Sequence, residues 1–176
     1  MPPPWRRKLD ATRLPASITP MALPSYPSAR RFSKILGAME PFRVLEHTAD
    51  VGFEAFGSTR EEVFANAGRA LMNIVVDLDS VDHAAAVPVQ AEGSDPPDLL
   101  VNWLSEILYL YDADGWVFRG FEVRSLTDRS ISAIARGEKF DPARHQVNLL
   151  VKAVTYHQLA LEKTADGWRA QVYVDI

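Results

Sequence analysis

The stretch Leu45-Glu46-His47-Thr48-Ala49-Asp50-Val51-Gly52 separates two runs of residues that have the pattern of β-strands. Apolar residues alternate with other residues on both sides of it, as in half-buried strands. The alternating apolar positions are Phe42, Val44, Val51, Phe53 and Ala55. Asp is depleted in strands and favoured where it bonds its own backbone or a cation. Asp50 therefore predicts either a tight turn or bulge capped by its carboxylate, or a hard-cation ligand whose partners come from elsewhere in the chain.

Two helices are predicted downstream of this stretch. Thr59 as N-cap with Glu62 three residues later has the form of a capping box, and apolar residues then recur at helical spacing through residues 63–74. Asp95 followed by two prolines is a second start signal, and the broadly apolar residues 99–111 continue that helix. Both helices are expected to pack their apolar faces against a sheet.

The rest of the chain predicts strands joined by short turns. The expected strands lie in residues 42–57 (two strands), 86–93, 117–126, 130–140, 147–163 and 168–174. About seven strands and two helices with short connections predict an α+β domain with a largely antiparallel sheet. We place this domain in residues 40–176. Residues 1–39 are rich in proline and arginine, so we expect a disordered extension or a mis-assigned start before Met39.

Composition excludes several classes of protein. The 176 residues are 47% hydrophobic and 24% charged, which fits one soluble domain. No apolar run approaches the roughly 18 residues of a membrane span. The chain has no cysteine, which excludes disulfides and thiolate chemistry and leads us to expect a cytoplasmic protein. A net charge of −4 argues against nucleic-acid binding driven mainly by counterion release.

The last two residues suggest a second acidic group. Asp175 and a free carboxylate on Ile176 would end a strand with several anionic oxygens close together. If this end lies beside Asp50, the three residues could form a calcium or magnesium cage, because both ions prefer oxygen ligands. A solvated strand end is the simpler alternative.

Four short motifs occur in order along the chain. They are His47-Thr48-Ala49-Asp50-Val51-Gly52, then Asp141 with Arg144 and His145, then Lys152-Ala153-Val154-Thr155-Tyr156-His157, and finally Asp175-Ile176. Together they resemble the archease family over residues 40–176. The resemblance implies a protein that is not itself an RNA ligase but activates an RtcB-type RNA ligase in tRNA splicing or RNA repair. It would promote guanylylation of the ligase and its repeated turnover, and would contact RNA only through the ligase and no membrane.

The resemblance also implies site residues. The family's metal site falls on Asp50, Asp175 and Ile176, with calcium as the usual ion, although such ligands also suit magnesium or manganese. We expect His47, Lys152 and His157 to face the partner or to support the site, with Lys152 paired to a carboxylate.

Strand geometry and residue type add two expectations. On a regular strand Lys152 and Tyr156 share one face, which would let Tyr156 support the core. Each histidine, including His145, has a structural hydrogen-bonding role as its alternative.

Two other functions are weighed against ligase activation. A chaperone-like modulator of a tRNA methyltransferase is the stronger rival, because the family is linked to that role too. A metal-dependent hydrolase would use His47 as base with Asp50 and Asp175 holding the metal. The sequence offers that enzyme no clear nucleophile, no glycine-rich phosphate loop and no second histidine ligand.

Overall fold

The structure is a computed structural model that describes residues 40–46 and 51–176. The strands in these residues are β1 Phe42–Glu46, β2 Val51–Gly57, β3 Ala85–Glu92, β4 Trp116–Leu126, β5 Ser130–Lys139, β6 Ala153–Val154, β7 Ala160–Thr164 and β8 Gly167–Asp175. The helices are α1 Arg60–Val75 and α2 Pro96–Asp114, with a short 3-10 turn η1 at Leu78–Ser80. The predicted α+β class is confirmed.

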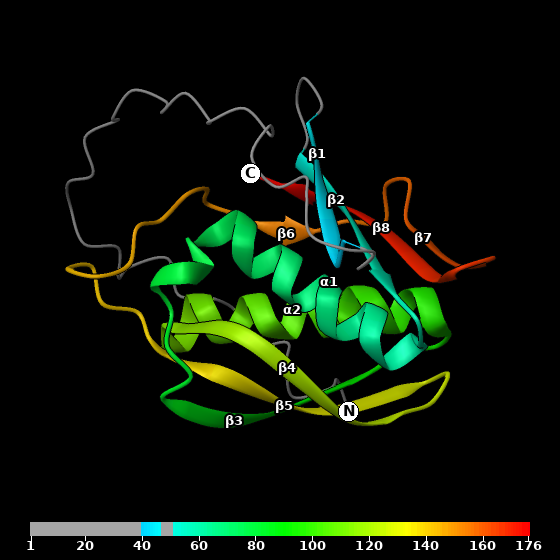
Figure 1. Cartoon of the computed structure of the whole chain (residues 1–176), viewed down its shortest axis with the longest axis horizontal. Coiled ribbons are helices and arrows are strands. Elements are labelled where there is room, and N and C mark those ends of the chain that lie inside the picture. The colour runs from blue at the N-terminus through cyan, green and yellow to red at the C-terminus, as the bar shows by residue number, and fades with distance from the viewer. Residues whose placement is uncertain (1–39, 47–50) are drawn as a thin grey trace, which may run out of the picture. The chain divides into compact units, whose positions relative to one another are not determined.

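The strands form two antiparallel sheets, whereas the sequence predicts one. The larger sheet has the order β1-β2-β8-β6, with β7 pairing with the same edge of β8 as β6, and the smaller sheet has the order β3-β5-β4. Both helices lie between the two sheets and contact each of them (Figure 1). A helix in this position must bury apolar residues on more than one face, which explains why α2 is apolar around most of its circumference.

Side chains cap both helices as predicted. At α1, Thr59 Oγ1 accepts from the Glu62 amide at 3.2 Å, and Asp95 Oδ1 accepts from the Asp98 amide at 2.9 Å at α2. The capping box differs in one detail, because Glu62 Oε2 accepts from the Ser58 amide at 2.8 Å, one residue before the N-cap. Gly115 ends α2 in the left-handed region at φ 66°. No helix in the described part of the chain is long and apolar enough to cross a membrane.

The long strand predicted over residues 147–163 is wrong. Only β6 and β7 are strands there, and a turn with Gln158 at φ 47° separates them, so residues 40–46 and 51–176 contain eight strands. The first part of this segment is used differently, because the amides of Asn148 and Leu149 donate to the carbonyls of Val75 and Ile74 at 2.8 and 3.2 Å. These carbonyls are left without helical partners at the end of α1, so this segment completes the helix end before it reaches the sheet.

Candidate functional site

The end of β8 lies between two other strands of the larger sheet. Val174 pairs with Val51, the first residue of β2, and Asp175 pairs with Ala153 of β6. Figure 1 shows this end of β8, marked C, close to the start of β2. Asp50 directly precedes Val51 in the chain, and Asp175 directly follows Val174, the residue that pairs with Val51. Asp50 and His47 themselves lie outside the described residues.

Lys152 is joined to this strand end by both its backbone and its side chain. Its amide donates to the Asp175 carbonyl at 2.8 Å, and its Nζ donates to the main-chain oxygen of Ile176 at 2.9 Å. Asp175 is exposed, and Ile176 retains 39% of its accessible surface. The Lys152 ammonium group and the main-chain oxygen of Ile176 therefore lie together at an exposed edge of the sheet.

The oxygens at this edge are of the kind that a hard cation prefers. Asp175 contributes a carboxylate and Ile176 a main-chain oxygen, whereas calcium takes about 6–8 oxygen ligands. Within residues 40–46 and 51–176, no group of three histidine, aspartate or glutamate side chains is arranged to hold a metal. These two residues fit calcium in donor type, and a complete site needs further donors.

A packed column on the same sheet explains Gly52. A Cβ atom at Gly52 would lie 2.8 Å from the Tyr173 ring, so only glycine leaves room for this ring over β2. The ring of His157 packs edge-on against Tyr173 with centroids 5.6 Å apart. The Tyr173 carbonyl accepts from both the amide and the hydroxyl of Thr155 at 3.0 Å. Tyr173 therefore connects β2, β8 and the segment that follows β6.

His157 is exposed on this column. Its Nε2 lies 3.1 Å from Gln158 Nε2, and its amide donates to Thr155 Oγ1 at 3.3 Å. Because an amide nitrogen can only donate, this contact makes Nε2 the acceptor and puts the proton of the neutral ring on Nδ1. His157 thus holds the turn between β6 and β7 and leaves one ring nitrogen as a donor.

The expectation that Tyr156 supports the core is wrong. Its side chain is exposed, at 59% of its accessible surface, and its hydroxyl donates to Asp98 Oδ1 at 2.5 Å. This hydrogen bond, with smaller contributions from burial and from the charges of Asp98 and Asp95, raises the pKa of Tyr156 to about 12. The regular strand needed for Lys152 and Tyr156 to share a face does not form, because β6 ends at Val154.

A buried carboxylate that the sequence analysis missed joins the strands near the site. Glu54 of β2 is 5% exposed and accepts from Arg43 Nε of β1 at 2.9 Å and from Arg169 Nε of β8 at 2.7 Å. Burial is the largest single influence and raises the pKa of Glu54, but the hydrogen bonds and charges of the two arginines together lower it. The alternation of β2 puts Glu54 on the face opposite Phe53 and Ala55, a position that normally predicts an exposed residue.

His145 has a structural role. It is 3% exposed, and its Nδ1 accepts from the Asp141 amide at 2.9 Å, so the neutral ring carries its proton on Nε2, 3.2 Å from Glu138 Oε1. Arg144 adds ion pairs to Glu138 at 2.9 Å and to Asp82 at 2.8 Å. These contacts fasten the 141–146 loop to β5 and to the residues before β3.

Residues 42–176 match the model of the Archease protein family (MTH1598/TM1083). Protein archease of Methanosarcina acetivorans is 48% identical over 139 residues, covering 77% of this chain and 95% of that protein. Protein archease of Pyrococcus abyssi is 40% identical over 142 residues, covering 78% and 100%.

The solved structures agree with the sequence comparisons. The solution structure of Methanobacterium thermoautotrophicum protein 1598 matches with a TM-score of 0.68 and 31% identity, covering 78% of this chain and all of that one. The residues that match the family model include the paired strand ends and the loops just described. This chain belongs to the archease family.

Proposed function

We propose that this protein activates an RtcB-type RNA ligase and is not itself a ligase. In this role it promotes guanylylation of the ligase and allows repeated sealing of RNA ends during tRNA splicing or RNA repair. Membership of the archease family supports the proposal. The observation that carries it is the exposed end of β8, where Asp175 and Ile176 lie between the start of β2 and Lys152.

The proposal includes a cation at this end of the sheet. Asp50, Asp175 and the main-chain oxygens of Ile176 would hold calcium, and the same oxygens would accept magnesium or manganese. Such an ion would neutralise the carboxylates and present positive charge toward a partner. Lys152 positions the main-chain oxygen of Ile176, while His47 and His157 face the partner or support the site.

The proposed mechanism is one of positioning. The acidic end enters the nucleotide or metal site of the ligase and helps to arrange the triphosphate, the metal ions or the reacting histidine. In nucleotidyl transfer, orientation and charge stabilisation supply most of the rate acceleration, so a protein that improves geometry increases the rate without a catalytic residue of its own.

The test measures guanylylation of the cognate ligase and repeated RNA sealing, with catalytic amounts of the full chain. We expect acceleration by the wild type and its loss in Asp50→Ala and Asp175→Ala. Asp166→Ala is the matched control, since Asp166 is an exposed aspartate in the turn between β7 and β8. Equal acceleration by wild type and Asp175→Ala would contradict the proposal.

Two further measurements separate the parts of the proposal. Calcium binding by titration calorimetry should be lost in Asp175→Ala and weakened when extra residues are appended after Ile176. If calcium binding and activation both survive the extension, terminal oxygens of Ile176 are not ligands. If the ligase is unaffected while a cognate tRNA methyltransferase changes its activity, the modulator function replaces ligase activation.

A further inference from the structure

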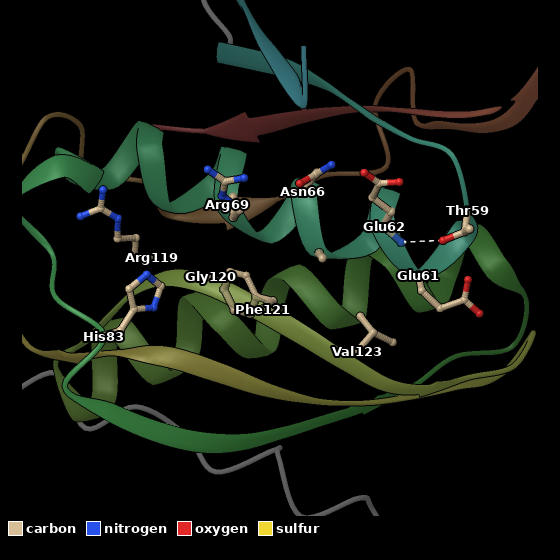
Figure 2. A pocket seen from close by; sticks show the side chains of 11 residues that line it. Thr59, Glu61, Glu62, Asn66, Arg69, His83, Arg119, Gly120, Phe121 and Val123 are labelled. Carbon is tan, nitrogen blue, oxygen red and sulfur yellow. Dashed lines mark hydrogen bonds between the residues drawn. The ribbon is translucent and has the colours of Figure 1, made fainter. Parts of the chain in front are cut away.

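A groove of about 580 Å³ lies between α1 and the smaller sheet. Its walls come from one face of α1, from β4 and from the residues before β3, and Figure 2 shows the side chains that line it. None of the residues proposed for ligase activation contributes to it. The volume lies within the roughly 300–1,000 Å³ range of small-molecule sites.

One end of the groove is cationic. Arg69 of α1, His83 and Arg119 of β4 line this end, as Figure 2 shows. Arg119 is held in place because its Nη1 donates to the Val81 carbonyl at 3.2 Å, with Asp79 Oδ1 3.5 Å from Nη2. Arg69 forms no ion pair with any acidic side chain among the described residues. Two arginines and a histidine from three separate segments thus line the same end of one groove.

The backbone of β4 is irregular at this point. The pairing register with β5 shifts between Phe118 and Gly120, which makes Arg119 an extra residue on an edge strand. Bulges of this kind change the direction of a side chain and are frequent beside binding sites. The space at Gly120 is open, because an added Cβ would make a single ordinary contact, 3.4 Å from the His83 ring.

The remainder of the groove is apolar and then acidic. Phe121 and Val123 line its middle, and Phe121 approaches α1 so closely that a Cβ at Gly68 would lie 2.8 Å from the ring. Glu61 and Thr59 line the end away from the arginines (Figure 2). Glu61 is exposed and its carboxylate can accept hydrogen bonds from a bound ligand.

We propose that this groove binds a 5′-phosphorylated nucleoside. The phosphate contacts Arg69, His83 and Arg119, because guanidinium groups bind phosphate oxygens in pairs and with charge-assisted hydrogen bonds. The nucleoside lies along Phe121 and its hydroxyl or amino groups reach Glu61. The same chemistry is present in a free nucleotide and at the 5′ end of an RNA strand. This inference does not depend on ligase activation.

The experiment is an amide chemical-shift titration of the full chain by NMR. The probes are AMP, a 5′-phosphorylated trinucleotide, adenosine, inorganic phosphate and a hexaglutamate peptide. We expect AMP to give saturable shifts at the amides of Arg69, His83, Gly120 and Phe121. Arg69→Ala and Arg119→Ala should each weaken binding by about tenfold or more, since each removes charge-assisted hydrogen bonds. Lys163→Ala, which removes an exposed cation from β7, is the control and should bind as the wild type does.

Each result decides the proposal. If the trinucleotide binds more tightly than AMP, the bound nucleoside belongs to the 5′ end of an RNA strand. If AMP binds more tightly, the ligand is a free nucleotide. The proposal is overturned if AMP gives no saturable shift at millimolar concentration, or if Arg69→Ala binds AMP normally. It is also overturned if inorganic phosphate binds as well as AMP, or if hexaglutamate displaces AMP from the same amides.

Discussion

Replacing Glu54 by glutamine tests how the three strands that lead to the site are held together. Glu54 is 5% exposed and receives hydrogen bonds from Arg43 and Arg169. Hydrogen bonds to charged groups contribute about 1.5–3 kcal/mol each. The Arg43 side chain is 60% exposed, so solvent screening reduces the stability that its hydrogen bond contributes. Glutamine also retains one acceptor oxygen. We therefore expect Glu54→Gln to lower the free energy of unfolding by about 1–3 kcal/mol at neutral pH.

The pH dependence of this loss follows from the pKa of Glu54. Although burial, the largest influence, raises this pKa, the two arginines lower it below the ordinary value of 4.5 in the folded protein. The ionised Glu54 therefore contributes stability above about pH 4.5, and this contribution disappears as the pH falls through the folded pKa. The stability difference between wild type and Glu54→Gln should shrink over the same range.

Urea denaturation from neutral pH to about pH 3 measures both effects. Glu162→Gln is the matched control, because Glu162 also pairs with Arg169 but its side chain is 53% exposed. Its removal should cost under about 1 kcal/mol. The reasoning is refuted if the two variants lose equal stability, or if the difference between wild type and Glu54→Gln does not change with pH.

Three further substitutions test other contacts. Gly52→Ala should lower the free energy of unfolding by about 1–3 kcal/mol, because the new Cβ meets the Tyr173 ring; an unchanged urea midpoint would contradict this. Tyr156→Phe should cost under about 1 kcal/mol, and in the wild type ultraviolet absorbance should show this phenol ionising near pH 12. Because the pKa of Tyr156 is raised, its hydrogen bond to Asp98 stabilises the fold below about pH 10, the ordinary pKa of tyrosine. This stabilisation is lost as the pH rises toward about 12. His145→Ala should cost about 2–4 kcal/mol, since it removes a buried ring and leaves its hydrogen-bond partners unpaired; a loss below about 1 kcal/mol in urea would contradict a structural role.

Local sequence signals predicted most of the fold. The two helices and their caps follow from residues such as Thr59 and Asp95, whose side chains act within a few residues of themselves. The prediction of one long strand over residues 147–163 failed because the first part of this segment forms hydrogen bonds with the end of α1, more than 70 residues away in the chain. No local pattern records such a partner. Division of the strands between two sheets also depends on long-range pairing, so it too was missed.

The candidate site was predictable in part. The pairing of Val51 with Val174 places the strand that follows Asp50 next to the strand that ends at Asp175. The motifs alone do not specify that pairing. Tyr173 and Glu54 were missed because their contacts cross strands. Tyr156 was misplaced because the prediction assumed a regular strand that ends at Val154. Metal binding by Asp50, Asp175 and Ile176 stays a prediction.

The register between β2 and β8 connects the structural contacts to the proposed function. A shift of this register by one residue would turn every side chain of one strand to the other face, so it would move Asp175 away from its position next to the start of β2. Two contacts oppose such a shift, because Tyr173 fits only over Gly52, and Arg169 reaches Glu54 across the same strand pair. Substitutions at Gly52 or Glu54 should therefore reduce ligase activation even though neither residue is proposed to bind the ion or the partner. Loss of activation in these variants that parallels their loss of stability would mean that the proposed activation of the ligase depends on the rigidity of the sheet as well as on the charge at its end.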